Sequence, residues 1–239
     1  MIMKILYLIS SLKYGGAEKQ TILDANLIAD KNLVFLGYYF EGPQKELVSN
    51  KVKIVKINKR NYLFTAFVIS RLVRKYKIQI IHSSLFSSMI ISSLSSIFCD
   101  VKIIWHFHSH EYNIPFIHRM AFNFLSYLPS VKKICFVSEE LINYFFNNGF
   151  NFPKHKIKLL YNSTTFKNEI IAKKNFDEIV IGYVGRLVSL KRVNYLIELV
   201  EYLLQKQIKN FLLLIVGDGD QRSFLESQVF NKNLQKYIL

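Results

Sequence analysis

Short apolar runs alternate along this chain with longer stretches whose apolar residues recur at helical spacing. Most of the short runs are continuous, as in LLLIV, which is typical of parallel strands buried on both faces. Helical spacing is clearest in Arg192–Lys206. Strands and helices in this alternation predict an α/β fold of parallel sheets with helices on both faces. The predicted strands are Lys4–Ile9, Leu33–Phe40, Lys53–Ile57, Gln79–His82, Lys102–Trp105, Lys133–Val137, Lys156–Leu160, Ile179–Tyr183 and Phe211–Val216.

A change in composition divides this pattern in two. Residues 165–178 are polar and charged without clear periodicity, and they predict a linker between a first domain, 1–164, and a second domain, 179–239. The second domain has too few residues for a complete doubly wound domain. Because Tyr237–Leu239 resembles the start of another buried strand, we expect the second domain to be incomplete.

One apolar stretch is long enough to suggest a membrane span. Ile78–Cys99 carries no Asp, Glu, Lys or Arg over 22 residues. It nevertheless contains eight serines and His82, and its apolar residues fall into two blocks. We therefore predict a strand, a turn and a helix in this stretch.

The charge and the cysteine content of the chain limit which partners and which cellular compartment are expected. The chain has 32 Lys and Arg against 17 Asp and Glu, and this net charge of +15 favours phosphates, nucleic acid or an anionic membrane surface. No nucleic-acid-binding motif is visible, so no nucleic acid is expected as a partner. Two cysteines without paired spacing fit a reducing, cytoplasmic compartment and argue against a disulfide framework or a zinc site.

Two motifs in the first domain follow predicted strands and carry candidate chemistry. Gly15 and Gly16 open a helix whose N–H groups can bind an anion, with a tight packing turn as an equal alternative. The second motif has three alternating histidines, which would share one face of an extended segment. A single histidine that bonds a substrate is more plausible here than a metal site, and a core or surface cluster is the alternative. These histidines are His106, His108 and His110.

Two further motifs follow strands in the second domain. Arg186 and Lys191 lie five residues apart across a strand–helix turn and can converge on one diphosphate. The alternative is a pair of solvated loop cations. The motif Gly217–Asp220 contains an Asp-x-Asp pattern, which in other proteins holds a divalent metal. We interpret it as a glycine turn in which Asp220 caps the next helix.

In their order and spacing, these motifs resemble those of the family 4 glycosyltransferases, retaining enzymes of the GT-B fold with two facing Rossmann-like domains. The resemblance runs from end to end of the chain, and the order of the motifs is more specific than any one of them. It includes GGAE after the first strand, the histidine loop, Phe136-Val137-Ser138 before a helix, Tyr161-Asn162 at the end of the first domain, VGRLVSLKR and LLLIVGDGDQRSFLE.

The resemblance implies a retaining glycosyltransferase that moves a sugar from a nucleotide-sugar donor to a glycan or lipid-linked acceptor, in cell-surface polysaccharide synthesis. The first domain would be the acceptor side and the second would bind the donor nucleotide. His108 would be the catalytic residue beside the transferred sugar. Cations that stabilise the leaving diphosphate would make a metal or cofactor unnecessary. The implied donor-binding residues are Gly15, Gly16, Arg186, Lys191, Gly217 and Gly219, and the secondary candidates are His106, Ser138 and Asn162.

The chain also departs from the family pattern. It has Lys191-Arg192 where the family usually has Lys-Gly, and Asn162-Ser163 where Asn-Gly is usual. The family places two glutamates farther into the second domain, where they contact the donor sugar and ribose, and nothing in this chain aligns with them. We therefore expect this chain alone to transfer sugar poorly. The alternative function is a truncated, non-catalytic binding module.

Two stretches of the first domain have the composition of membrane-surface helices. Residues 61–77 and 112–128 are rich in aromatic and aliphatic side chains, and the first also carries four basic residues towards its end. Such helices can lie on an anionic membrane and receive a lipid-linked acceptor, although ordinary core faces with a solvated basic end are the alternative. The expected location is the cytoplasm, with a peripheral position on the inner face of the membrane as the further expectation.

Overall fold

The computed structural model describes residues 2–110, 114–163 and 178–239. The chain divides into two compact units, Met1–Thr165 and Phe166–Leu239. The linker expected at 165–178 lies outside the described residues except for Glu178.

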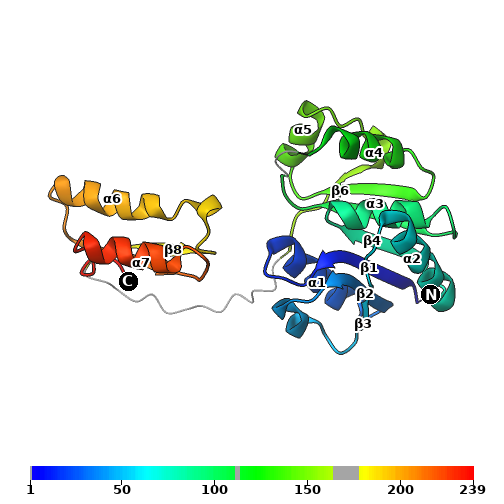
Figure 1. Ribbon diagram of the computed structural model, residues 1–239, viewed down its shortest axis with the longest axis horizontal. Coiled ribbons are helices and arrows are strands. Elements are labelled where there is room, and N and C mark those ends of the chain that lie inside the picture. Colours follow the sequence, from blue (N-terminus) through cyan, green and yellow to red (C-terminus); the bar gives the residue numbers. More distant parts are fainter. Residues whose placement is uncertain (1, 111–113, 164–177) are drawn as a thin grey trace. The chain divides into compact units, whose positions relative to one another are not determined.

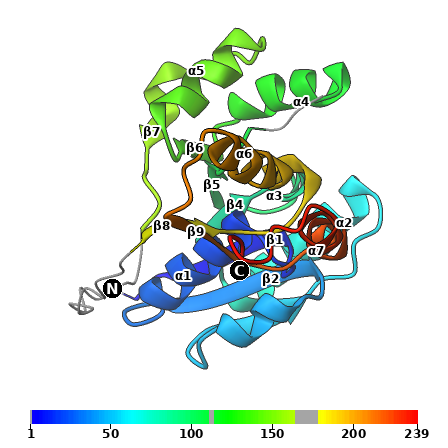
Figure 2. The same cartoon turned by 90° about the vertical axis from the view of Figure 1, so that its left-hand side faces the viewer.

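The first unit is built on one parallel sheet of seven strands. Its order is β3-β2-β1-β4-β5-β6-β7 (Figures 1 and 2). Every strand predicted from the sequence in this region is present. The continuous apolar runs of the central strands β1, β2 and β4 are buried on both faces as expected, whereas the edge strands β3 and β7 are more exposed. The strands are β1 (Lys4–Ser11), β2 (Leu33–Phe40), β3 (Lys53–Lys56), β4 (Ile80–Ser84), β5 (Lys102–Phe107), β6 (Val131–Phe136) and β7 (Ile157–Leu159).

Helices cover both faces of this sheet. On one face, α1 (Gly16–Ile28) packs Ile22 and Ala25 against β1 and β2. The opposite face carries four helices around one large core, and Trp105 lies fully buried in it, with its indole N–H donating to Ser93 Oγ at 3.0 Å. These four are α2 (Tyr62–Tyr76), α3 (Phe86–Ser95), α4 (Phe116–Ser126) and α5 (Glu139–Asn147), and two short 3-10 helices are η1 (Pro43–Leu47) and η2 (Lys154–Lys156).

The uncharged stretch Ile78–Cys99 forms β4, a turn and α3, as predicted. Its serines suit a buried helix because their hydroxyls donate to nearby backbone carbonyls, as Ser92 and Ser93 do to Met89. Within the described parts of the chain, no helix is long and apolar enough to cross a bilayer.

The strand order places a topological switch point between β1 and β4. From β1 the chain builds outward through β2 and β3, and it then returns to add β4 on the other side of β1. In open α/β sheets, ligands bind outside the carboxyl ends of the strands at such a point. We therefore expect a ligand site of the first unit to be formed by the loops after β1, β4 and β5.

The second unit repeats the strand–helix pattern on a smaller sheet. Strands β8 (Ile179–Val184) and β9 (Phe211–Val216) pair in parallel, and a single bridge joins Leu213 to Ile238 near the last residue. Helices α6 (Asn194–Gln205) and α7 (Arg222–Asn231) pack on this sheet, and the 3-10 helix η3 (Ser189–Lys191) precedes α6. The prediction that Asp220 caps α7 is wrong, because the N-cap is Gln221 and no side chain caps the helix.

Candidate active site

The glycine turn after β1 leaves part of the α1 N-terminus open. Gly15 is the N-cap of α1 and provides no side-chain acceptor for the first N–H groups. The Glu18 carboxylate covers Gly15, since a Cβ built there would lie 2.0 Å from Glu18 Oε2, and Ser11 Oγ donates to it at 3.2 Å. A Cβ at Gly16 would meet nothing within 4 Å. An anion therefore finds open backbone at Gly16, whereas at Gly15 it meets the Glu18 carboxylate.

A second glycine, which the sequence motifs did not single out, supports this turn. A Cβ at Gly42 would lie 2.1 Å from the carbonyl oxygen of Leu12, so only glycine lets the chain after β2 pass so close to the turn. Gln44 then donates from its side chain to the Gly15 carbonyl at 3.1 Å. The turn is thus held from outside by the segment that follows β2.

Three histidine rings contact one another in the first unit across the carboxyl ends of β4 and β5, and we call them the histidine stack. His82 of β4 stacks on His106 of β5, with ring centroids 5.3 Å apart, and His106 contacts His108 at 4.0 Å. His106 is 1% exposed and His82 8% exposed. We expected His110 to share their face, but its ring instead packs edge-on against Tyr144 of α5.

Most ring nitrogens in this stack lack a hydrogen-bond partner among the described residues. Both nitrogens of His106, Nε2 of His82 and Nδ1 of His108 are buried and unpaired there. Burial, the largest cause, lowers the pKa of His108 to about 3, and the neighbouring His106 adds to the effect while Asn162 opposes it. Burial likewise lowers the pKa of His82 to about 3 and that of His106 to about 4. All three imidazoles are therefore neutral near pH 7, and they offer hydrogen bonds without charge.

A chain of hydroxyl groups connects α1 to the histidine stack. Thr21 Oγ1 donates to Ser84 Oγ at 2.9 Å, and Ser84 Oγ lies 3.3 Å from His108 Nε2. These groups come from α1, from the end of β4 and from the loop after β5, so they span the switch point. The structure thereby connects the helix that starts at Gly16 with His108.

The loop after β4 also holds a strained residue. Leu85 has φ 68° and ψ 145°, in a region that bulky side chains rarely adopt. It lies between Ser84 and the first residue of α3, at the switch point. Such strain persists only where the surrounding structure fixes it, and it is common beside ligand sites.

The two secondary candidates outside the histidine loop have different surroundings. Asn162 interacts with His108, and the adjacent Ser163 accepts a hydrogen bond from Gln20 of α1 at 3.1 Å. Ser138 instead caps α5, because its Oγ accepts from the Leu141 N–H at 3.1 Å. The structure therefore brings Asn162 to the histidine stack and gives Ser138 a helix-capping role.

In the second unit, two loops at the carboxyl ends of β8 and β9 are joined by backbone contacts. Leu187 N–H donates to the Asp218 carbonyl at 2.9 Å, and its own carbonyl accepts from Gln221 at 2.9 Å. A Cβ at Gly217 would lie 1.9 Å from the Gly185 carbonyl oxygen, and one at Gly219 would lie 2.2 Å from that of Leu187. Both glycines therefore allow a close approach of the two loops.

These joined loops carry Arg186 and Lys191. Both side chains are exposed, and neither has an ion-pair partner among the described residues. The next residue, Arg192, has φ 51°, which explains why glycine suits this position better than a residue with a side chain. The arrangement presents two unpaired cations on a backbone that the glycines hold in place.

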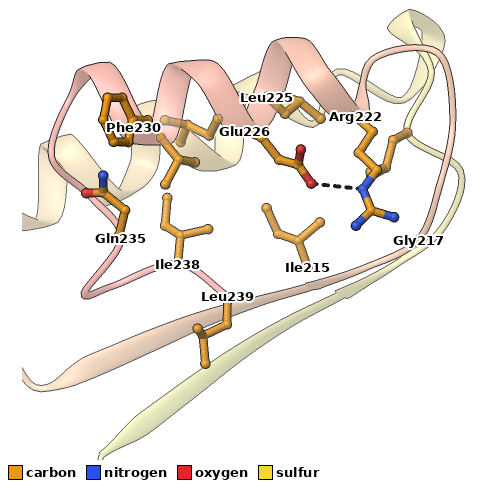
Figure 3. A pocket seen from close by; sticks show the side chains of 12 residues that line it. Ile215, Gly217, Arg222, Leu225, Glu226, Phe230, Gln235, Ile238 and Leu239 are labelled. Atoms are coloured by element: carbon orange, nitrogen blue, oxygen red, sulfur yellow. Dashed lines mark hydrogen bonds and ion pairs between the residues drawn. The ribbon is translucent and has the colours of Figure 1, made fainter.

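A cavity of about 380 Å³ lies between α7 and β9 in the same unit (Figure 3). Apolar side chains such as Leu225, Phe230 and Ile238 line most of it, and Arg222 Nε pairs with Glu226 Oε1 at 2.8 Å at one end. Gly217 is its one contact with the candidate residues. An apolar cavity whose arginine is already paired is a poor place for a diphosphate.

Within the described residues, no group of three His, Cys, Asp or Glu side chains is placed to hold a metal ion. Glu111, which follows the histidine motif, lies outside those residues.

Two family profiles match the chain, one after the other. The profile of "Glycosyltransferase Family 4" matches residues 38–164, and the profile of "Glycosyl transferases group 1" matches residues 166–239. A curated relative from Campylobacter jejuni is 24% identical over 247 residues, which cover 95% of this chain and 65% of the relative. Its name is GalNAc-alpha-(1->4)-GalNAc-alpha-(1->3)-diNAcBac-PP-undecaprenol alpha-1,4-N-acetyl-D-galactosaminyltransferase. The chain thus spans slightly less than two thirds of that relative's length.

Solved structures show the same fold. A glycosyltransferase from Rickettsia africae superposes with a TM-score of 0.79 at 18% identity, over 100% of this chain and 67% of the other. The Anabaena protein HepE, in complex with UDP, superposes with a TM-score of 0.77 at 18% identity, over 99% of this chain and 68% of the other. The predicted GT-B-like α/β fold is confirmed.

Proposed function

This chain belongs to glycosyltransferase family 4, and from that premise we propose that it works as a retaining glycosyltransferase. It moves a sugar from a nucleotide-sugar donor to a glycan or lipid-linked acceptor during cell-surface polysaccharide synthesis. The observation that carries the proposal is the pair of unpaired cations, Arg186 and Lys191, on loops that Gly217 and Gly219 hold together.

The donor diphosphate binds at these cations. Arg186 offers a planar fork of N–H donors and Lys191 a point charge, a combination suited to phosphate oxygens. As the bond to the sugar breaks, negative charge grows on the leaving diphosphate, and cations already in place stabilise it without a metal. Gly217 and Gly219 shape the nucleotide pocket by keeping side chains away. The UDP bound in the HepE structure supports a uridine nucleotide as the first donor to test.

His108 lies beside the transferred sugar in this proposal. Its neutral imidazole can form a hydrogen bond with a sugar hydroxyl. Because the ring carries no positive charge, it does not repel the positive charge that develops at the reacting carbon. His106 and Ser84 hold the ring, and Asn162 adds a further contact. At the start of α1, Gly16 leaves open backbone for the acceptor, whereas the Glu18 carboxylate covers Gly15. The anomeric configuration is retained when the acceptor attacks from the same face of the sugar as the departing diphosphate. No enzymatic nucleophile is therefore assigned.

The name of the Campylobacter relative, a transferase for an undecaprenol-diphosphate-linked glycan, supports the proposal for the acceptor and the location. We propose a lipid-linked acceptor of the same class for this chain. The protein then works in the cytoplasm, on the inner face of the membrane that carries this lipid.

The test is a transfer assay with α-linked UDP-sugars and a polyprenyl-diphosphate-linked glycan. NMR of the product reports the configuration at the new linkage, which we expect to be α. His108→Asn should remove transfer while UDP still binds, and His155→Asn, an exposed residue of η2, is the matched control. A β-linked product would overturn the retaining mechanism, and wild-type transfer by His108→Asn would overturn the role of His108. UDP binding without transfer would favour the non-catalytic binding module.

A further inference from the structure

Helix α4 presents an apolar stripe to the outside of the first unit. Its exposed side chains recur at helical spacing along one face, and Ile117 is 72% and Phe124 74% exposed. The opposite face packs Phe122 and Leu125 into the core, so the stripe is additional to the face that stabilises the fold. The full stripe is Phe116, Ile117, Met120, Phe124 and Tyr127.

The beginning of α2 carries a second apolar patch on the same side of the sheet. Leu63, Phe64 and Phe67 are exposed there, and Phe67 packs edge-on against Phe98 in the turn that follows α3, with ring centroids 5.8 Å apart. Helices α2, α3 and α4 all pack on one common core on this face, and Figure 1 shows them there. The stripe of α4 and the patch of α2 therefore belong to one surface, here termed the α2–α4 surface.

Basic residues surround the apolar side chains of this surface, and acidic ones are nearly absent. The Arg60 guanidinium lies over the Phe64 ring at 4.9 Å, and that of Arg119 lies over Phe116 at 5.2 Å. Residues 47–138 contain thirteen lysines and arginines but only Asp100 and Glu111 as acidic residues. Most of the net charge of the chain therefore comes from this segment, which contains α2, α3 and α4 together with β3, β4, β5 and β6.

A groove at the start of these helices shares one lining residue with a small cavity beside the histidine stack. A cavity of about 220 Å³ is lined by Tyr62 of α2, by Phe86 and Ile90 of α3, and by Pro115 and His118 at the start of α4. Phe86 also lines the small cavity that contains His106 and His108. The groove is mostly apolar, and a single aromatic ring contributes to both cavities.

We propose that the α2–α4 surface docks on an anionic phospholipid membrane. Aromatic and aliphatic side chains ringed by arginine and lysine match the boundary between lipid headgroups and acyl chains. Such a surface, almost free of carboxylates, suits phosphate headgroups. At the two ends of α6, Arg192 and Lys206 also lie over the rings of Tyr195 and Tyr202. The exposed apolar residues of α6 differ in setting because the same helix carries Glu198 and Glu201. This inference deepens the proposed function, on whose lipid-linked acceptor it rests, because the groove would hold such a lipid at Phe86, which also lines the small cavity beside His108.

The test is flotation of the chain with vesicles of phosphatidylglycerol mixed with phosphatidylcholine, and with vesicles of phosphatidylcholine alone. We expect binding to the anionic vesicles that falls as salt is added, and at least about tenfold weaker binding to the neutral ones. Ile117→Ser with Phe124→Ser should weaken binding to anionic vesicles about tenfold or more. The matched control, Tyr195→Ser with Tyr202→Ser, should bind as the wild type does.

Two readouts separate the possible outcomes. The fluorescence of Trp105, the single tryptophan, checks that the α4 variant is folded, and UDP titration checks the nucleotide site. Loss of UDP binding with intact vesicle binding would refute the proposed function and leave the membrane inference standing. Unchanged vesicle binding by the folded α4 variant, or no vesicle binding by the wild type, would overturn the inference. A wild-type dimer that the α4 variant breaks would also overturn it, because a second copy would then cover the surface.

Discussion

The two units share a strand–loop–helix plan but place opposite chemistry at the carboxyl ends of their strands. In the first unit, the candidate groups are buried and neutral, with three stacked imidazoles and a chain of hydroxyls. In the second, Arg186 and Lys191 are exposed, charged and unpaired among the described residues. The same strand–loop–helix plan thus supplies a buried, neutral hydrogen-bonding site in one unit and an exposed cationic site in the other.

The largest expected effect concerns pH. All six histidines of the chain lie in the first unit, and burial keeps three of them neutral when folded. The unfolded chain takes up protons on them below about pH 6.5, so it binds more protons than the folded unit down to about pH 4. As the pH is lowered through this window, the free energy of unfolding of the first unit should therefore decrease, by up to about 1.4 kcal/mol per pH unit for each imidazole.

Urea unfolding followed by Trp105 fluorescence measures this effect, because the single tryptophan lies in the core of the first unit. The second unit contains no histidine and should show no such dependence, which proteolysis of 178–239 can follow. An unfolding midpoint that stays constant between about pH 7 and about pH 5 would contradict the neutral stack.

The next effect concerns the glycines of the second unit. Gly217→Ala places a methyl group 1.9 Å from the Gly185 carbonyl oxygen, so the joined loops must move apart. We expect a loss of about 1–3 kcal/mol in the stability of the second unit, as for overpacked sites, with no change in Trp105 fluorescence. Gly182→Ala, where a Cβ meets nothing within 4 Å, is the matched control. Equal stability of the two variants would show that the loops are not in close contact.

A smaller effect is expected at Ser138. Its hydroxyl caps α5, so Ser138→Ala should cost the first unit about 1 kcal/mol. UDP affinity should not change, because the structure gives Ser138 this capping role. Calorimetry and urea unfolding of the same variant measure both quantities. A clear fall in UDP affinity with unchanged stability would instead show that Ser138 binds the ligand.

The smallest effect is expected at Arg192. Its left-handed backbone costs roughly 1–2 kcal/mol for a residue with a side chain, and Arg192→Gly removes that strain. Glycine also adds freedom to the unfolded chain, which offsets part of the gain. We therefore expect the second unit to be stabilised by about 1 kcal/mol or less. Destabilisation measured by urea unfolding would show that the Arg192 side chain makes a contact that outweighs the strain.

The fold was largely predictable because its strands are continuous apolar runs with clear ends. Leu33–Phe40 and Phe211–Val216 were predicted with the bounds that the structure shows. The site was less predictable. His82 stacks on His106 only because β4 and β5 are neighbours in the sheet, where the two residues lie diagonally across the strand pair, and no spacing along the sequence encodes that contact. The same holds for the hydroxyl chain from Thr21 to His108.

Predictions from local sequence patterns also failed where the same few residues allow two local structures. Asp220 seemed suited to cap α7, but the close approach of Gly219 to Leu187 fixes the turn so that Gln221 is the N-cap. The three alternating histidines would share a face only in an extended segment, and β5 ends at Phe107. In both cases tertiary contacts decided between local alternatives.

The central claim is that the cations of the second unit bind a nucleoside diphosphate, and calorimetric titration of the chain with UDP tests it most directly. Replacing Arg186 and Lys191 together by alanine removes two charged partners of the phosphates, and the affinity should fall about 100-fold or more. Lys206→Ala, at the other end of α6, is the control and should bind as the wild type does. A folded double variant that binds UDP as tightly as the wild type would contradict the account.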